Sequence, residues 1–488
     1  MIYTKKTLNK VDVEGKKVIL RLDLNVPMSH GQILDDNRIK AALPTIQYLL
    51  DKNSKIIILS HLGRVKNNDD KESPDKSLEV VYLNIKNRLS LNNVHFNSGT
   101  DEKEITKAVN DLKEGEILIL ENTRFYDVDS KGTNVKLESK NDAKLAKFWA
   151  SLGDVFINDA FGTSHRSHAS NVGIAKNIKE SAIGLLVEKE LNMLSQACEN
   201  PEKPLVAILG GAKIADKIKT IEKISKVADK ILIGGGMAFT FLKAQGKEIG
   251  KSLVDESSIP VAKRFIEELG DKLVLPVDFN CSDSIEGYWS IQVKEGADIP
   301  SDMLGLDIGK KTIKLFCNEI KEAKTIIWNG PMGVFENPKF SKGTRKICKE
   351  IYKKTKKDAF TLIGGGDSAS AAIKFGFENG FTHISTGGGA SLAYLEGTIL
   401  PGIDAVSNVS DIKPIKVEKE SKKEESKTSS KKAAPAKAKP VAKKAAPAKA
   451  KPVAKKAAPA KAKPVAKKAA PAKAKTATKQ PVAKKGKK

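Results

Sequence analysis

Most of the arginines in this 488-residue chain lie near its beginning, close to polar residues that follow short apolar runs. Of the 85 Lys and Arg residues only eight are Arg, and six of these fall within the first 166 positions. Where Lys is the usual cation, a retained Arg indicates a position that needs the planar guanidinium group, which binds phosphate or carboxylate through paired hydrogen bonds. The arginines and strand-end polar residues of this region are Arg21, Asp23, Asn25, Arg38, His61, Arg64, Arg124, Asn158, Asp159, His165 and Arg166. The cluster of Arg and His around Asp23 and Asn25 predicts a site for a small ligand with several negative charges, the alternative being a set of surface salt bridges.

The second half of the chain has a different signal, because its apolar runs lead into glycine turns at residues 210–211, 234–236, 364–366 and 387–389. A strand, a glycine turn and a helix expose unpaired backbone N–H groups to which a phosphate can come close. Helix–strand packing can explain one such turn, whereas four favour a nucleotide site. The site is neither a P-loop, whose nearest match at 246–252 is one residue short, nor a GxGxxG dinucleotide motif.

Three charged residues stand beside these turns. Lys213 and Lys217 are four residues apart, which predicts one shared helix face from which an ammonium group reaches a bound phosphate. Asp367 directly follows a glycine turn, where a carboxylate can hold Mg²⁺ on a nucleotide. The structural alternatives are an exposed helix lysine for Lys217 and a helix N-cap for Asp367.

Covalent catalysis and zinc chemistry find no support in the sequence. It shows no Ser-His-Asp or Cys-His arrangement and no His/Cys spacing typical of zinc, and its four cysteines have no CxxC spacing. The chemistry we expect is therefore electrostatic, without a covalent intermediate.

The elements that must position these residues follow from ten continuous apolar runs separated by stretches of helical length. Continuous rather than alternating runs are typical of parallel strands covered by helices on both faces. Ten runs exceed one ordinary sheet, so we predict an α/β protein with two doubly wound parallel-sheet domains. The segment GLLVEKELNMLSQAC reads as a helix that joins them.

The net charge of +26 is unevenly distributed. Residues 416–488 contain 26 Lys and 4 Glu, which leaves only +4 for the first 415 residues. The twelve-residue unit KKAAPAKAKPVA occurs three times from Lys431, and its prolines and lack of large apolar residues predict a disordered arm. No apolar stretch is long enough for a membrane span or a signal peptide, so we expect a cytoplasmic protein with no membrane partner.

Ten motifs give the chain a resemblance to the phosphoglycerate kinase family, in the family's order and over nearly all of residues 1–415. They are RLDLNVP (21–27), NRIKAALPTI (37–46), SHLGR (60–64), LENTRF (120–125), INDAFGTSHRSHAS (157–170), ILGGAKIADK (208–217), GGGMAFTF (234–241), WNGPMGVFE (328–336), GGGDSA (364–369) and STGGGASLAYLEG (385–397).

The resemblance implies reversible, Mg²⁺-dependent phosphoryl transfer between ATP and the carboxylate of 3-phosphoglycerate, giving ADP and 1,3-bisphosphoglycerate, in a hinge-bending protein that we expect to be a monomer. It implies an N-terminal domain over 1–184 completed by about 392–415, a connecting helix over 185–200, a C-terminal nucleotide domain over 201–391 and a basic tail over 416–488.

The family's site residues carry over to matching positions. Those implied to bind phosphoglycerate are Arg21, Asp23, Asn25, Arg38, His61, Leu62, Gly63, Arg64, Arg124 and Arg166. Those implied to bind Mg-nucleotide are Gly211, Lys213, Lys217, Gly235, Asn329, Glu336, Gly365, Gly366, Asp367 and Ser368, with Glu336 on the ribose and Asp367 towards the metal. Arg38, Lys213 and the helix N-terminus at Gly388 are implied to act on the phosphoryl group in transit.

Two departures from the family are visible. Arg64 is followed by Val65 where the family usually has Pro, and the family lacks the lysine arm. The arm resembles histone-H1-like tails, so a further hypothesis is sequence-independent binding of nucleic acid or other polyanions, against a plain solvating tail as the alternative.

Overall fold

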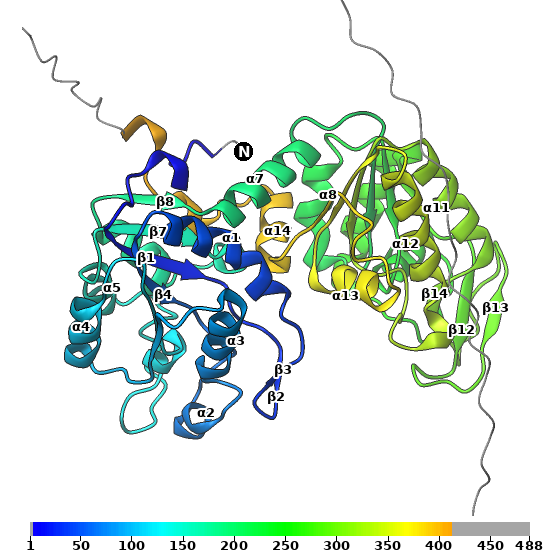
Figure 1. The fold of residues 1–488 in the computed structure, drawn as a ribbon. Coiled ribbons are helices and arrows are strands. Elements are labelled where there is room, and N and C mark those ends of the chain that lie inside the picture. The colour runs from blue at the N-terminus through cyan, green and yellow to red at the C-terminus, as the bar shows by residue number, and fades with distance from the viewer. Residues whose placement is uncertain (1–2, 412–488) are drawn as a thin grey trace, which may run out of the picture. The chain divides into compact units, whose positions relative to one another are not determined.

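The computed structural model describes residues 3–411, and the expected basic tail lies outside them (Figure 1). The first of its sheets has six parallel strands in the order β5-β6-β4-β1-β7-β8. These strands are β1 (Lys17–Leu22), β4 (Lys55–Leu59), β5 (Val94–Asn97), β6 (Ile117–Leu120), β7 (Val155–Asp159) and β8 (Ser181–Ile183). A two-residue pair, β2 (Met28–Ser29) with β3 (Gln32–Ile33), stands beside it.

Helices cover both faces of this first sheet. Along β1 the alternate residues Val18 and Leu20 enter one core cluster and Ile19 enters another, so a continuous apolar run serves two cores. One cluster includes α1 (Asn37–Asp51) and α3 (Glu79–Leu89), and the other includes α4 (Glu102–Asp111), α5 (Ala143–Ala150) and α6 (Ile174–Asn177). The short helix α2 (Asn68–Glu72) contributes no buried residue.

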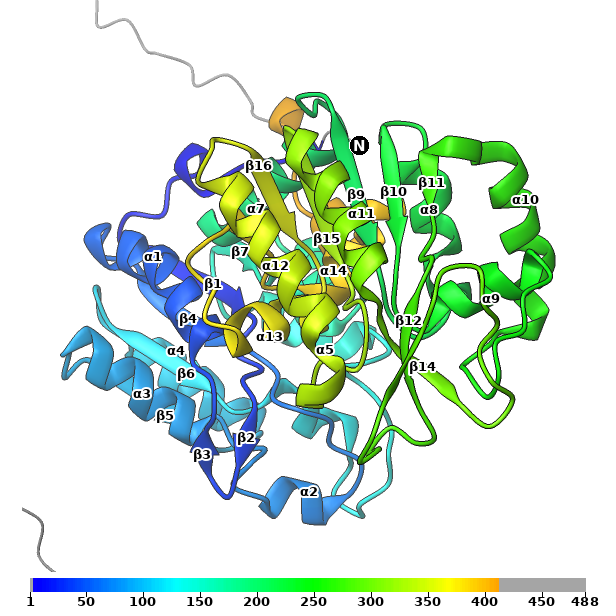
Figure 2. The same ribbon diagram turned by 90° about the vertical axis from the view of Figure 1, so that its right-hand side faces the viewer.

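The second sheet also has six parallel strands, in the order β11-β10-β9-β15-β16-β17. They are β9 (Leu205–Leu209), β10 (Lys230–Ile233), β11 (Leu273–Val274), β15 (Thr325–Asn329), β16 (Phe360–Ile363) and β17 (His383–Ile384). One face packs on α7 (Leu185–Cys198), α8 (Ile218–Ile224), α9 (Met237–Ala244), α10 (Ile259–Leu269) and α14 (Gly388–Leu395). The other face packs on α11 (Lys310–Glu322), α12 (Lys342–Thr355) and α13 (Gly366–Lys374), which Figure 2 shows in front of the strands.

The two doubly wound parallel sheets confirm the predicted fold class, and each of the ten apolar runs forms a strand. The sequence did not reveal β5 and β8, because β5 is a half-exposed edge strand and β8 has only three residues. It also did not reveal a small antiparallel sheet, β13-β12-β14, built from β12 (Phe279–Ser282), β13 (Ile291–Val293) and β14 (Leu304–Ile308).

The last described segment returns to the first sheet. It includes α15 (Pro401–Asp404), and the backbone of Gly402 accepts a hydrogen bond from Asn158 Nδ2 at 2.7 Å. Asn408 forms a β-bridge with Lys5, and Ser407 contacts Ser181. No helix of the described part is long and apolar enough to cross a membrane.

Val65, the departure from the family pattern, is buried in a small apolar cluster with Phe125 and Val128. A β-branched side chain therefore fastens the start of the following loop to the segment after β6, at a position where the family usually has the ring of Pro.

Trp149 of α5 offers a test of the first core, since its side chain is 1% exposed and its ring meets Tyr126 edge-on at 5.1 Å. We expect Trp149→Ala to lower the free energy of unfolding by about 3–5 kcal/mol, because the lost contacts leave a cavity. Urea denaturation followed by circular dichroism measures this. Trp149→Phe should cost clearly less, and equal losses in the two variants would contradict the packing described here.

Candidate active site

The residues predicted to bind an anion lie beyond the carboxyl ends of the first sheet's central strands. Asp23 and Asn25 follow β1, the segment from His61 to Arg64 follows β4, and Arg124 follows β6. Arg166 lies in the loop after β7, and Arg38 lies in the first turn of α1. Strands distant in the sequence thus bring these residues to one edge of the sheet, where open α/β folds bind ligands.

Specific contacts hold this edge. Arg38 pairs with Asp23 at 2.7 Å between Nη1 and Oδ2. Asn25 Oδ1 accepts a hydrogen bond from the backbone N–H of Gly63 at 2.7 Å, and Asn122 binds the backbone N–H and C=O of Leu62. The loop after β4 is therefore fixed at Leu62 and Gly63, which leaves the exposed Arg64 side chain at its end.

Arg21 lies beneath the site, because it is fully buried and its guanidinium binds groups of the protein. Its Nε donates to Ser170 Oγ at 2.8 Å, and another nitrogen lies 3.4 Å from His61 Nδ1. Ser170 Oγ in turn donates to the buried carboxylate of Glu138 at 2.5 Å. Burial lowers the pKa of Arg21 and raises that of Glu138, while their mutual attraction opposes both shifts.

Arg124 has donors that the protein leaves unused. Its Nη1 binds Asp127 at 3.1 Å and also Ser139, and its Nη2 lies 3.4 Å from His168 Nε2. Within residues 3–411, the buried Arg124 Nε and His168 Nδ1 have no hydrogen-bond partner. Buried donors without partners are costly, so a ligand or water is expected to bind there.

The histidines of this edge are neutral. Burial lowers the pKa of His168 to about 3, and the nearby charges of Arg124 and Arg21 add to the effect. Burial and the same arginines also hold the pKa of His61 well below its usual range. Burial, with repulsion from Arg124 and Arg64, lowers the pKa of Arg166. These repulsions show a cluster of cations that an anion would relieve.

Two strand-end residues of the sequence analysis have structural partners instead. Asn158 binds Gly402, as described above, and Asp159 accepts hydrogen bonds from the backbone N–H groups of Leu186 and Val187 at the start of α7. The polar atoms of these two side chains therefore hold other segments of the fold.

A cavity of about 880 Å³ adjoins the glycine turns of the second sheet. Its wall includes Lys213, Lys217 and Asn329 and the backbone of the turns after β9, β16 and β17. Lys217 Nζ donates to Asn329 Oδ1, and burial lowers the pKa of this lysine against the opposing attraction of Asp216, Glu396 and Asp367. The predicted nucleotide residues on this wall are Gly211, Lys213, Lys217, Asn329, Gly365, Gly366, Asp367, Ser368 and Gly388.

The predicted common helix face for Lys213 and Lys217 is wrong. Lys213 lies in a loop, Lys217 ends a 3₁₀ turn, and α8 begins only at Ile218. Both lysines still line the same cavity because the loop wraps around it. The side chain of Ser368 is buried, and its Oγ accepts a hydrogen bond from the backbone N–H of Gly330 at 2.6 Å. Its hydroxyl therefore holds the turn after β15.

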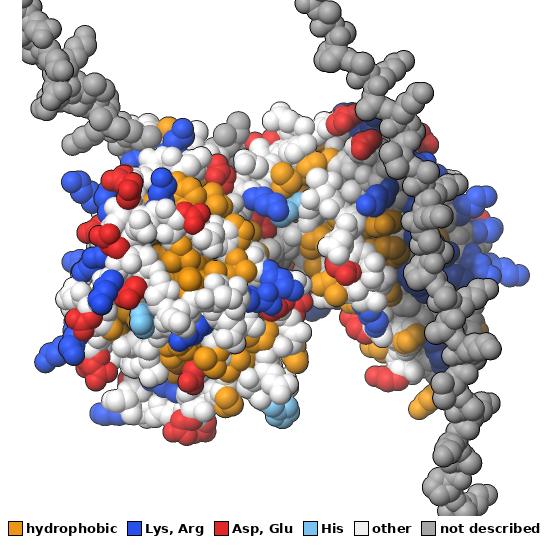
Figure 3. Space-filling view, viewed as in Figure 1, with side chains coloured by type: hydrophobic (Ala, Val, Ile, Leu, Met, Phe, Trp, Pro, Cys, Tyr) orange, Lys and Arg blue, Asp and Glu red, His pale blue; other side chains and the backbone are white. Residues whose placement is uncertain are grey.

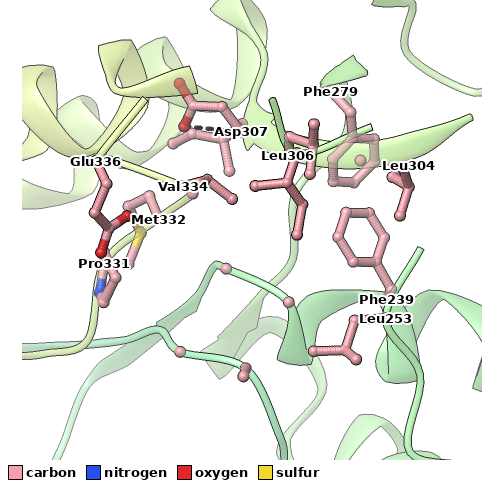
Figure 4. Close-up of a pocket in the computed structure, with 18 of the residues that line it drawn as sticks. Phe239, Leu253, Phe279, Leu304, Leu306, Asp307, Pro331, Met332, Val334 and Glu336 are labelled. Carbon is pink, nitrogen blue, oxygen red and sulfur yellow. Dashed lines mark hydrogen bonds between the residues drawn. The ribbon is translucent and has the colours of Figure 1, made fainter. Parts of the chain in front are cut away.

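An apolar pocket of about 380 Å³ shares Gly211, Ala212 and Asp367 with the glycine-lined cavity. Figure 4 shows Phe239, Phe279 and Leu304 at one end and Glu336 at the other. Gly235 also lines it. Asp307 lines the pocket too, but its carboxyl accepts backbone N–H groups of Gly343 and Ile308, and burial raises its pKa to about 8.

The N-terminus of α14 connects the two regions. A Cβ on Gly387 would lie 2.6 Å from the ring of Phe161 and 2.8 Å from Gly162 Cα, in the loop after β7. A Cβ on Gly388 would lie 3.0 Å from the backbone nitrogen of Gly366, at the glycine-lined cavity. Only glycine fits a turn held so closely on both sides, and the turn presents backbone N–H groups between the two sites.

Sequence reasoning missed several contributors to the site. The carboxylate of Glu138, in a turn, and the apolar side chains of Phe279 and Leu304, in short strands, lie in no motif that the sequence singled out, and Phe239 lies in one but looks like ordinary helix core.

The family model for phosphoglycerate kinase matches residues 8–398 of the chain. A relative from Malacoplasma penetrans, named phosphoglycerate kinase, is 55% identical over 435 residues, covering 88% of this chain and 92% of its own. One from Listeria monocytogenes with the same name is 54% identical over 404 residues, covering 83% and 99%.

Solved structures agree with these relatives. A phosphoglycerate kinase from Coxiella burnetii matches with a TM-score of 0.71 at 38% identity, and one from Pyrococcus horikoshii with 0.68 at 32%; each match covers 82% of this chain and 98% of that structure. The chain therefore belongs to the phosphoglycerate kinase family, and the reaction it catalyses is that family's glycolytic phosphoryl transfer.

Proposed function

We propose that the cation cluster of the first sheet binds 3-phosphoglycerate, or the bisphosphate in the reverse direction. The exposed or partly free groups of Arg38, Arg64, Arg124 and Arg166 would meet its phosphate and carboxylate, and the buried Arg21 would support them from below. The mutual repulsion of Arg166, Arg124 and Arg64 supports this role, since a phosphate would neutralise these cations. Asp23, Asn25, His61, Leu62 and Gly63 complete the proposed set.

The nucleotide would bind across the two adjoining pockets of the second sheet. Its base would enter the apolar pocket, with Glu336 towards the ribose, and its phosphates would lie on the glycine turns near Lys213 and Lys217. An apolar slot beside a glycine-lined cavity with two cations matches the two ends of such a molecule, which supports the proposal.

Asp367 fits the role of a metal ligand on the nucleotide. It is exposed, it lines both pockets, and among the described residues it has no ion-pair or hydrogen-bond partner for its carboxylate. The same residues contain no cluster of three or more acidic, His or Cys side chains, so Mg²⁺ would depend on Asp367 together with phosphate oxygens, as is common for nucleotide-bound magnesium. When bound, Mg²⁺ neutralises phosphate charge.

The position of the α14 N-terminus is the single observation that carries the mechanism. The attacking carboxylate of 3-phosphoglycerate is already ionised at neutral pH, so it needs no general base. The protein has to bring two anions together and stabilise charge on the transferring group. The N–H groups at Gly388 lie between the two sites, and Arg38 and Lys213 would add a cation from each side.

We also propose a division into domains at the boundaries expected from the sequence, with closure about α7. Glu190 of α7 is fully buried and binds His383 at 2.8 Å and the backbone N–H of Thr386 at 2.7 Å, directly before the turn that begins at Gly387. A change in the position of α7 would thus reach the turn through Glu190. Closure would exclude water, which otherwise competes for the phosphoryl group.

A second candidate function is binding of nucleic acid by the lysine arm. The described part adds a basic surface of similar chemistry, since α12 has only Glu350 as an acidic residue and Figure 3 shows Lys and Arg gathered on that side of the molecule. Its exposed cations are Lys342, Arg345, Lys346, Lys349 and Lys353. Lysines without aromatic neighbours bind phosphate backbones through counterion release and read no sequence. We propose a cytoplasmic monomer for both functions.

Arg38→Ala tests the catalytic assignment. We expect kcat to fall by about two to three orders of magnitude, because a cation aimed at the developing charge is lost. A coupled assay of ATP-dependent phosphorylation of 3-phosphoglycerate measures this, with urea denaturation to verify the fold. Arg88→Ala is the matched control, since Arg88 is similarly exposed but pairs with Asp36 outside the site. Near-normal turnover of Arg38→Ala would overturn the assignment.

Asp367→Asn tests the metal ligand. We expect the Mg²⁺ concentration for half-maximal activity to rise about tenfold, because an amide binds Mg²⁺ less well than a carboxylate. Titration of Mg²⁺ at fixed ADP, by calorimetry, gives a second measurement without turnover. Asp216→Asn, on the wall of the same cavity, is the control. An equal effect in the control, or none in Asp367→Asn, would contradict the proposal.

Truncation after Ile415 tests the second candidate function. Filter binding with DNA and RNA across salt concentrations should show steep, sequence-independent binding by the full chain and its loss on truncation, with kinase activity unchanged. Binding that survives truncation but is lost when Lys346 and Lys349 become Gln would move the function to α12. No binding by the full chain near 0.15 M salt would leave the arm without this role.

A further inference from the structure

The hairpin between β12 and β13 carries the most exposed large hydrophobic side chain of the described residues. Tyr288 is 94% exposed, and two neighbours in the same hairpin, Ile285 and Trp289, are 52% and 46% exposed. Apolar side chains grouped in one short loop are unfavourable in contact with water, so a group that covers them gains free energy of binding.

This hairpin forms part of the mouth of the apolar pocket. Ile285 lines the pocket, as does Phe279 from the strand that leads into the hairpin. Leu253, which also lines the pocket, is 45% exposed. The pocket thus has two half-exposed aliphatic residues in its lining, which a flat apolar group would cover.

Hydrogen bonds tie the hairpin to the segment that follows Glu336, another residue of the pocket. Asn337 Nδ2 donates to the backbone carbonyl of Ile285 at 2.9 Å. Lys339 Nζ donates to the carbonyl of Gly287 at 2.9 Å and lies 5.6 Å from the centre of the Tyr288 ring. The base of the hairpin is held by Ser282 Oγ, which donates to the carbonyl of Trp289 at 2.6 Å. Polar contacts to backbone carbonyls therefore keep the tip beside the pocket, while its aromatic side chains stay exposed and free to turn towards a ligand.

We propose that the tip of this hairpin, residues 285–289, closes over the bound nucleobase, and that the Tyr288 ring contacts the face of the base that the pocket leaves open. The inference rests on the proposed binding of the base in the apolar pocket. An aromatic ring suits the surface of a base of any kind, because every base offers a flat π-face. Tyr288 is thus a positioning residue for the nucleotide.

The charge of the region favours the base over the phosphates as the partner of Tyr288. The two lysines of the proposed phosphate site, Lys213 and Lys217, line the other cavity and are absent from the apolar pocket. The apolar pocket has Lys251 in its lining against the acidic Glu336 and Asp367, and Lys339 beside the hairpin is already engaged by backbone carbonyls. Triphosphate oxygens would therefore find less attraction there than at the cavity of Lys213 and Lys217.

Two ligands separate a contact with the base from a contact with phosphate. Tyr288→Ala should weaken binding of MgADP roughly tenfold, as expected for loss of one aromatic contact to a base, and should leave binding of inorganic tripolyphosphate within twofold. In turnover, KM for MgATP should rise while kcat changes little, because the contact is made equally in ground and transition states. Tyr288→Phe should retain normal affinity. A Tyr288→Ala variant with unchanged affinity for MgADP would overturn the proposal.

Trp289 gives an independent readout of closure. The other two tryptophans, Trp149 and Trp328, are buried, so emission from the exposed Trp289 should change when MgADP binds and not when tripolyphosphate binds. The Trp289→Phe variant should lose this change. A signal that persists in Trp289→Phe comes from elsewhere and would count against movement of the hairpin.

Leu253→Asp keeps this inference separate from the proposal on which it rests. Leu253 lines the same pocket and is half-exposed, so the substitution places a charge there without disturbing the core. If Leu253→Asp weakens MgADP but not tripolyphosphate and Tyr288→Ala weakens neither, the base pocket stands and the role of Tyr288 is wrong. If neither variant affects MgADP, the assignment of the base to this pocket is wrong as well.

Discussion

The close fit of the glycine turn at residues 387–389 constrains the whole active region. Its backbone touches the loop after β7 at Phe161 and Gly162 and the turn after β16 at Gly366, with no room for a side chain at Gly387. The two sheets, which share a buried cluster that holds Ile183 of β8 and Leu205 of β9, therefore present their loops to the same few atoms. The parallel strands make this possible, because each sheet gathers its variable loops at one edge and leaves the packing of the strands unchanged.

The arginines of the first sheet repel one another, so the fold must place negative charges beside them. Buried carboxylates supply part of this negative charge: Asp23 pairs with Arg38, Asp127 pairs with Arg124, and Glu138 lies beneath Arg21 through Ser170. Burial is the main cause of the lowered pKa values of His61 and His168, and the positive charge of the nearby arginines adds to it. A phosphate and a carboxylate of a ligand would neutralise the positive charge that these carboxylates leave unpaired.

The sequence was sufficient to predict the strands that are continuous apolar runs and the residues that stand directly after them. It failed where a position depends on distant parts of the chain. Asn158 and Asp159 are the last two residues of β7, where the strand leads into a polar cluster, yet their polar atoms bind Gly402 and the start of α7. Lys213 and Lys217 have helical spacing, yet the loop around the cavity replaces the expected helix turn. The apolar pocket is formed in part by an antiparallel sheet whose short strands have no strong pattern, and Glu138 meets Ser170 and Arg21 only through tertiary packing.

The pairing between the two ends of the described chain bears on the order of biosynthesis. Lys5 forms a β-bridge with Asn408, and Ser407 contacts Ser181 of β8. The segment that packs against the first sheet is therefore synthesised nearly four hundred residues after the first strand of that sheet. The strands of the second sheet, by contrast, all lie between Leu205 and Ile384. A ribosome therefore completes the later-coded sheet before it releases the residues that finish the earlier one, and the lysine arm follows only after both sets of partners have been made.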